Sequence, residues 1–172
     1  DRQIKGMDFF ETHAPAVKWT MTRMLPILTA QLGLATKQVD CTAAFVHADI
    51  EKPPHYHRMS PEEKARQGVF VEMPRGFRQD GMVLRLKKNL YGLCSAPKMF
   101  TSLVRQKMEK LGFVTATEVD PCLYISDKVI CVNYVDDCLM FAKDMKDIDD
   151  TIAGLRKLDM TLEEEENVAG FL

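Results

Sequence analysis

The sequence predicts an α+β fold in which an antiparallel sheet has its helices packed on one face. Three observations support this class. Several short runs are rich in β-branched and aromatic residues, which is typical of buried strands. Longer stretches at residues 20–33, 96–111 and 145–159 have the pattern of helices. Residues 129–141 place two apolar flanks around a polar centre, which indicates a β-hairpin.

The first half of the chain begins with a helix near residues 20–33 and a strand near residues 36–42. Pro26 lies inside this helix and should kink or break it, because proline has no amide N–H and its ring clashes with the preceding turn. Residues 52–67 have the character of an insertion, in which Ser60 and Pro61 start a helix. Strands near residues 69–73 and 82–86 complete this half.

The second half begins with the helix at residues 96–111, where Leu103, Met108 and Leu111 recur at helical spacing and Gly112 is the expected stop. Three strands and a further helix then follow, near residues 122–126, 129–134, 138–142 and 145–159. The acidic block at residues 144–166 should therefore be this last helix, solvated, plus the glutamate run at residues 163–166.

Composition limits the classes of protein that fit. The chain has 172 residues, 46% of them hydrophobic and 28% charged, which is enough for one globular domain with a core. Its five cysteines show no Cys-x-x-Cys spacing, which argues against a disulfide framework or a zinc ribbon. We see no signal peptide and no run near the ~20 apolar residues of a membrane span, so we expect a reduced intracellular setting and no membrane partner.

Charge is unevenly distributed along the chain. One functional interpretation of the chain is a nucleic-acid-binding module without catalytic chemistry. The formal net charge of −2 argues against it. Residues 75–110 nevertheless hold nine basic and two acidic side chains, whereas residues 144–166 hold nine acidic and three basic ones. The basic block could follow a nucleic-acid backbone, although solvated faces explain both blocks equally simply.

Two adjacent aspartates, Asp136 and Asp137, lie at the expected tip of the hairpin. Neighbouring carboxylates repel one another and are costly to desolvate unless a positive charge lies between them. Mg²⁺ is suited to this position, because it binds one or two carboxylates together with substrate phosphates. Aspartate is also a common turn residue. The pair by itself therefore leaves a metal site and an ordinary tight turn as open alternatives.

Asp40 places a third carboxylate in another short apolar run. Two-metal nucleotidyl transfer needs carboxylates from separate strands that converge on ions about 3.5–4 Å apart. Asp40 and the aspartate pair would meet this need. The alternative is a structural aspartate that caps a turn before Thr42.

Residues 90–97 form a third element, in which Gly92 permits close backbone approach or positive φ and Pro97 suits the first turn of a helix. Taken alone, this segment is explained by a loop that leads into a surface helix.

Several motifs in this order resemble the reverse transcriptase of copia-type LTR retrotransposons. They are Gln-Val-Asp-Cys-Thr-Ala-Ala-Phe at 38–45, Val-Glu-Met-Pro-Arg-Gly-Phe at 71–77, Leu-Tyr-Gly-Leu-x-x-Ala-Pro at 90–97, Asp-Pro-Cys-Leu-Tyr at 120–124 and Tyr-Val-Asp-Asp at 134–137. A lone Tyr-x-Asp-Asp is a weak signal, but five ordered motifs are a specific one. The resemblance covers roughly residues 7–172 and implies a polymerase palm with part of the fingers.

The resemblance implies roles for individual residues. Asp40, Asp136 and Asp137 would be the catalytic carboxylates that bind two Mg²⁺ ions, with Mn²⁺ as an alternative ion, and the backbone carbonyl of Cys41 would complete a metal shell. Phe45 would lie beneath the sugar of the incoming nucleotide and exclude a ribose 2′-OH, or it is a core phenylalanine. Nucleotide contacts would come from Tyr91 and Gly92, and backbone contacts to nucleic acid from Arg85, Lys87, Lys88 and Lys98.

The implied function is RNA-directed DNA synthesis, in which a primer 3′-OH attacks a dNTP on an RNA or DNA template. The implied context is a retrotransposon polyprotein with integrase and ribonuclease H segments, in the cytoplasm, in virus-like particles, or in the nucleus. Much of the fingers' basic region, the thumb and ribonuclease H lie outside residues 1–172, and Thr161 replaces a family-like lysine. A truncated or decayed element that keeps the fold without catalysis is therefore the alternative.

Overall fold

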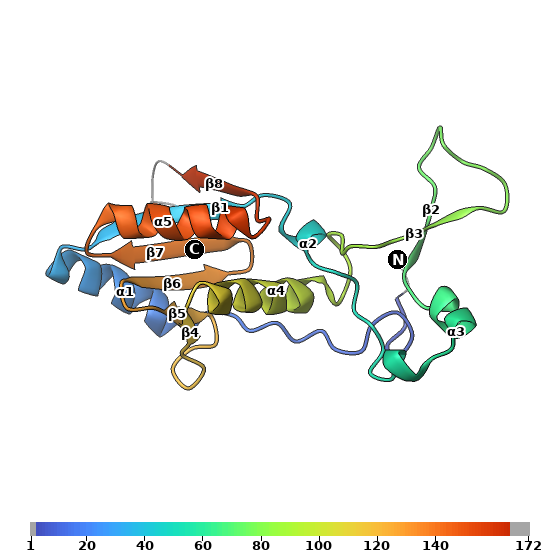
Figure 1. Cartoon of the computed structure of the whole chain (residues 1–172), viewed down its shortest axis with the longest axis horizontal. Coiled ribbons are helices and arrows are strands. Elements are labelled where there is room, and N and C mark those ends of the chain that lie inside the picture. Colours follow the sequence, from blue (N-terminus) through green and yellow to red (C-terminus); the bar gives the residue numbers. More distant parts are fainter. Residues whose placement is uncertain (1–2, 166–172) are drawn as a thin grey trace. The chain divides into compact units, whose positions relative to one another are not determined.

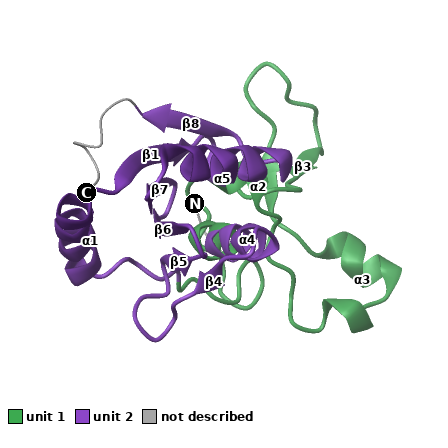
Figure 2. Ribbon diagram, turned by 60° about the vertical axis from the view of Figure 1, so that its left-hand side comes forward, with its two compact units in different colours: residues 1–13, 45–100 green, residues 14–44, 101–172 purple. Residues whose placement is uncertain are grey.

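The computed structural model describes residues 3–165. The chain divides into two compact units, residues 1–13 with 45–100 (unit 1) and residues 14–44 with 101–172 (unit 2), shown in Figure 2. The expectation of a single domain stays a prediction.

Unit 2 is built on a six-stranded sheet with the order β4-β5-β6-β7-β1-β8, in which every neighbouring pair is antiparallel (Figure 1). The strands are β1 (Ala35–Cys41), β4 (Val114–Thr115), β5 (Leu123–Ile125), β6 (Val129–Tyr134), β7 (Asp137–Ala142) and β8 (Leu162–Glu165). The predicted antiparallel sheet is thus confirmed, and the expected hairpin is β6–β7. Strand β1 lies between β7 and β8, although it is far from both in sequence.

Strand β8 differs from what we expected for the acidic tail. The glutamates at residues 163–165 pair in register with β1, from Asp40 opposite Glu163 to Gln38 opposite Glu165. Glutamate has low strand propensity, but an edge strand is fixed by pairing with its neighbour rather than by propensity. Glu166 lies outside the described residues.

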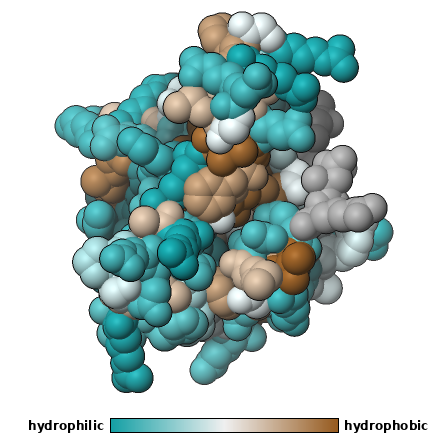
Figure 3. Space-filling model, turned by 90° about the vertical axis from the view of Figure 1, so that its right-hand side faces the viewer, coloured by the Kyte–Doolittle hydropathy of each residue, from teal (hydrophilic) through white to brown (hydrophobic). Residues whose placement is uncertain are grey.

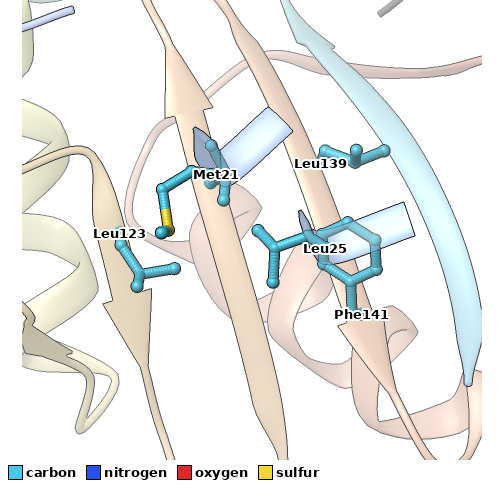
Figure 4. Packing of buried hydrophobic residues seen from close by; sticks show 6 residues of the cluster. Met21, Leu25, Leu123, Leu139 and Phe141 are labelled. Atoms are coloured by element: carbon cyan, nitrogen blue, oxygen red, sulfur yellow. The ribbon is translucent and has the colours of Figure 1, made fainter. Parts of the chain in front are cut away.

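Helix α1 (Trp19–Leu32) packs on one face of this sheet. Its side chains Met21 and Leu25 lie against Leu123 of β5 and against Leu139 and Phe141 of β7 (Figure 4). The helix continues through Pro26 to Leu32, so the predicted break does not occur, and the alternative of a kink stays a prediction. The helix ends at Gly33, whose φ of 62° is the left-handed conformation that glycine adopts without strain.

Helix α5 (Met145–Lys157) lies on the opposite side of the strands from α1, as does α4 (Ala96–Lys110) in its part from residue 101 onward (Figure 2). The buried face of α5 consists of Ile148, Ile152 and Leu155. Our expectation that helices cover one face is therefore wrong for α1. Alternation explains the result, since successive strand side chains point to opposite faces and both faces of β7 are apolar.

Unit 1 contains the two-stranded sheet of β2 (Phe70–Glu72) and β3 (Val83–Arg85) and several short helices. The predicted helix start is confirmed, because Ser60 and Glu63 form a capping box at the beginning of α3 (Pro61–Arg66). The other short helices are α2 (Ala44–His47), which begins in unit 2, and the 3₁₀ helix η1 (Tyr56–Arg58). The face of the molecule drawn in Figure 3 is mostly hydrophilic, and apolar residues are visible among the hydrophilic ones.

Glu51 ties the N-terminal segment of unit 1 to the start of α4. Its carboxylate accepts hydrogen bonds from the backbone N–H of Phe10 at 2.8 Å and from Lys98 Nζ at 2.7 Å. Lys98 also pairs with Glu11 at 2.7 Å. Burial alone would raise the pKa of Glu51, but these donors outweigh burial and lower it. The segment before α1 is therefore held by a charged network.

No helix within residues 3–165 is both long and apolar enough to cross a membrane.

Candidate active site

The tip of the β6–β7 hairpin carries the aspartate pair. Tyr134 and Asp137 form the last strand pair, so Val135 and Asp136 make a two-residue connection. Such connections need positive φ at one or both central positions and usually take Gly, Asn or Asp there. Here Val135 adopts a φ of 55°, which is strained for a β-branched residue. The tip is therefore held in place by contacts that outweigh this strain.

Asn133 provides those contacts. Its side chain is buried, with 3% of its surface exposed, and Nδ2 donates to the backbone carbonyls of Val135 at 2.9 Å and Asp137 at 3.2 Å. We assigned Asn133 no role from the sequence. A polar amide in an otherwise apolar strand next to a tight turn was the signal that could have found it, because such side chains often bond local backbone.

Strand β1 brings Asp40 beside the tip. Asp40 lies directly opposite Asp137 in the β1–β7 register. The backbone N–H of Cys41 donates to the carbonyl of Asp136 at 2.8 Å and closes the end of the ladder. Residues directly opposite one another in a sheet share a face. The structure therefore brings Asp40 and Asp137 together from separate strands, with Asp136 adjacent in the turn.

Strand β8 adds further carboxylates to this face. Glu163 lies opposite Asp40 on the other side of β1, and Glu165 lies opposite Gln38. In residues 3–165 none of the carboxylates of Asp40, Asp136, Asp137, Glu163 and Glu165 forms an ion pair with Lys or Arg. This end of the sheet therefore has a strongly negative and uncompensated potential.

The negative potential raises the pKa of two of these groups. Partial burial raises the pKa of Asp40, and repulsion from Asp137, Asp136 and Glu163 raises it further. Burial also raises the pKa of Asp137, repulsion from Asp136 adds to this, and a hydrogen bond from Gln38 acts in the opposite direction. Burial and mutual repulsion thus destabilise the ionised form of both carboxylates, as expected where a cation is to be bound.

The donor set fits a hard divalent cation, because carboxylate oxygens are the ligands that Mg²⁺ prefers. The thiol of Cys41 does not fit as a ligand, since burial raises its pKa to about 12 and keeps it protonated. Across residues 3–165, no three His, Cys, Asp or Glu side chains are grouped closely enough to hold an ion. A bound divalent cation would offset the repulsion among these carboxylates.

Phe45, Tyr91 and Gly92 belong to unit 1. Phe45 is 8% exposed, and its ring centroid lies 4.5 Å from that of Tyr91 and 6.1 Å from that of Phe100. This aromatic cluster favours the interpretation of Phe45 as a core residue. Tyr91 is 58% exposed and so accessible to a ligand. Gly92 has a φ of 93°, as its sequence context predicted.

The predicted backbone-binding residues are mostly engaged within the chain. Lys88 pairs with Asp49 at 2.7 Å, and Lys98 is neutralised by two glutamates. The guanidinium of Arg85 donates to the carbonyl of Lys64 at 3.0 Å. Lys87 is exposed. Lys87 forms no ion pair among residues 3–165, and the roles of all four stay predictions.

Comparison with known proteins agrees with the motifs. Residues 1–164 match the family described as "Reverse transcriptase (RNA-dependent DNA polymerase)". The chain is 34% identical over 150 residues to the retrovirus-related Pol polyprotein from transposon TNT 1-94 of Nicotiana tabacum, covering 83% of this chain and 10% of that protein. It is 25% identical over 171 residues to the Pol polyprotein from transposon RE1 of Arabidopsis thaliana, covering 95% and 11% respectively.

More distant similarity extends to yeast. The truncated transposon Ty1-A Gag-Pol polyprotein of Saccharomyces cerevisiae is 22% identical over 120 residues, which cover 70% of this chain and 9% of that protein. The chain thus spans about a tenth of the length of these relatives. The resemblance inferred from the motifs is confirmed, and the chain belongs to the reverse transcriptase (RNA-dependent DNA polymerase) family.

Proposed function

We propose that this chain carries the nucleotidyl-transfer site of a retrotransposon RNA-directed DNA polymerase, with Asp40, Asp136 and Asp137 as the ligands of two Mg²⁺ ions. The observation that supports this most is the register that sets Asp40 opposite Asp137 beside a strained Asp-containing turn. When bound, the ions would lower the pKa of the primer 3′-OH and stabilise the charge of the transferring phosphate.

The protein side chains would contribute position and charge. Strands β1 and β7 hold Asp40 and Asp137 on one face, and Asn133 fixes the turn that holds Asp136. The carbonyl of Cys41 is proposed as an additional oxygen ligand. Because these groups sit on paired strands, they need little backbone reorganisation on binding, which is how positioning contributes to phosphoryl-transfer rates.

We assign the palm to unit 2, since it contains the sheet and all three aspartates, and part of the fingers to unit 1. Tyr91 and Gly92 are proposed to contact the incoming dNTP, and Phe45 to limit the space around its sugar. Phe45→Ala tests the last point in a longer chain that extends template-bound primers. Increased ribonucleotide incorporation would support the role, and unchanged discrimination would assign Phe45 to packing alone.

The partners proposed for the site are an RNA or DNA template-primer, dNTPs and further segments of a Pol polyprotein, because the relatives are Pol polyproteins. An intracellular site of action follows from the same proposal. The alternative function is a catalytically inactive fragment that retains the fold. It is favoured by Thr161 in place of a family-like lysine.

Metal binding provides the direct test. Mn²⁺ titration of the chain, followed by electron paramagnetic resonance, should show saturable binding that Asp40→Asn and Asp137→Asn each weaken by at least tenfold. Asp49→Asn is the matched control, because Asp49 is an exposed carboxylate of unit 1 that pairs with Lys88. Equal binding by the wild type and the Asp40 and Asp137 variants would remove the proposed site.

Primer extension separates the active enzyme from the inactive fragment. Residues 1–172 alone should extend a primer negligibly, whereas a chain that continues through the thumb should extend it with Mg²⁺. Asp136→Asn serves as the blank in both experiments. Extension by the longer chain at the level of this blank would favour the decayed fragment, and extension by residues 1–172 would contradict our view that further segments are required.

A further inference from the structure

Gln38 is a buried amide on the same strand as Asp40. It is 3% exposed, although glutamine is mostly a surface residue. It lies two residues before Asp40 on β1, so both side chains project from the same face of the sheet. The amide is therefore placed on the face of the sheet that carries Asp40, next to the proposed metal site.

The strand register explains what Gln38 can reach. Gln38 is directly opposite Leu139, and Asp137 is the diagonal neighbour two residues along β7. Diagonal neighbours are about 7–8 Å apart at the backbone, a distance that a long side chain spans. The Gln38 side chain makes a hydrogen bond to the Asp137 side chain. An ionised carboxylate accepts only, so the amide Nε2 must be the donor.

The other end of the amide has no partner. Gln38 Oε1 is buried and makes no hydrogen bond within the described residues. A buried unsatisfied acceptor costs about 1–3 kcal/mol, and methionine would fill the same space without that cost. As a packing residue alone, the amide therefore lowers the stability of the fold. Within residues 3–165, the hydrogen bond recorded for its side chain is the one to Asp137.

An amide has an advantage over a cation at this position. A Lys or Arg side chain would neutralise the Asp137 carboxylate and compete with a bound ion, whereas a neutral donor orients the carboxylate and leaves its charge available. Asn133 cannot replace Gln38, because it donates to the backbone carbonyl of Asp137 and not to the carboxylate. Repulsion between Asp137 and Asp40 would otherwise turn the two side chains apart.

From this geometry we propose that Gln38 is a positioning residue, which holds the Asp137 carboxylate in the orientation that binds a divalent cation. The inference rests on the proposed function, because it needs Asp137 to be a ligand. Outer groups that orient metal ligands typically change metal affinity by about 10–100-fold when they are removed. Gln38 should act through Asp137 and make no contact with the ion.

The test compares variants of the whole chain by Mn²⁺ titration and by thermal unfolding in chelator. Gln38→Met keeps the volume and removes the donor, and we expect it to weaken Mn²⁺ binding about tenfold. The metal-free unfolding temperature should stay equal or rise, because the orphaned oxygen is lost. Gln38→Asn keeps an amide that is too short for the diagonal, and it should weaken binding like Gln38→Met.

Thr36→Val is the matched control. Thr36 precedes Gln38 by two residues on β1, and its hydroxyl is also buried without a hydrogen-bond partner in the described part of the chain. This variant removes a comparable orphaned oxygen from the same face without touching Asp137. Mn²⁺ affinity should therefore equal that of the wild type.

The possible results are distinct. Wild-type affinity in Gln38→Met and Gln38→Asn, with binding lost in Asp137→Asn, would overturn the positioning role and leave the proposed function standing. Equal Mn²⁺ binding by wild type and Asp137→Asn would overturn both. A fall in metal-free unfolding temperature that accompanies the loss of affinity in both Gln38 variants would show a structural role instead. If Gln38→Met does not fold, Gln38→Asn alone decides the outcome by the same criteria.

Discussion

Replacing Asp40 with asparagine should stabilise the metal-free protein. Asp40 lies between two like charges, with Asp137 directly opposite on β7 and Glu163 directly opposite on β8. No basic side chain among the described residues pairs with Asp40. Asparagine has nearly the same shape and removes the charge, so Asp40→Asn relieves both repulsions at once.

The size of the effect follows from the register. A directly opposite charged pair contributes roughly 0.2–1 kcal/mol in either direction, so two such pairs amount to about 1 kcal/mol. For a chain of this length, 1 kcal/mol corresponds to about 2–4 °C in the unfolding temperature. Glu163→Gln removes only one of the two pairs and should give about half of this increase.

Thermal unfolding followed by circular dichroism, in chelator near neutral pH, measures the effect. Since the pKa of Asp40 is raised, the native state holds this proton more tightly than the unfolded state, and stability falls as pH rises from the ordinary aspartate range through the raised pKa. The advantage of Asp40→Asn should therefore shrink as pH is lowered. Mg²⁺ should stabilise the wild type and not the variant. An unchanged or lower unfolding temperature for Asp40→Asn in chelator would refute the electrostatic reasoning.

Three further predictions concern the turn and unit 1. Asn133→Ala should cost about 2 kcal/mol in urea unfolding, because two backbone carbonyls at the tip lose their buried donor, and no loss would contradict its anchoring role. Val135→Gly should leave the free energy of unfolding nearly unchanged, since relief of about 1–2 kcal/mol of strain in the left-handed conformation offsets the entropy that glycine loses on folding. The buried control is Val132→Gly. A loss of stability in Val135→Gly as large as in this control would show that the strain is absent. Glu51→Gln should lower the free energy of unfolding by about 1–3 kcal/mol near neutral pH. In the wild type, this contribution of Glu51 is lost as pH falls through its lowered pKa, so the variant should lack that part of the pH dependence. The same pH dependence of stability in the variant and the wild type would exclude this contribution.

Local patterns were sufficient for much of the fold. A run of β-branched and aromatic residues with few charges placed β6 at residues 129–134, and helical spacing with a glycine stop placed α4 within one residue of its end. The aspartate pair at the hairpin tip and the capping box at Ser60 were also readable, because turns and caps depend on residues a few positions apart. The ordered motifs identified the family for the same reason.

Pairing and burial between distant segments were decided only by the tertiary structure. The glutamate run became strand β8 because β1 offered it an open edge, and α1 covers the second face because β7 is apolar on both sides. The diagonal contact of Gln38 depends on the β1–β7 register, which no pattern within either strand specifies. Sequence periodicity indicates which residues share a face, but only the packed sheet sets which strands adjoin and what each face meets, since that choice minimises exposed apolar surface and charge repulsion over the whole chain.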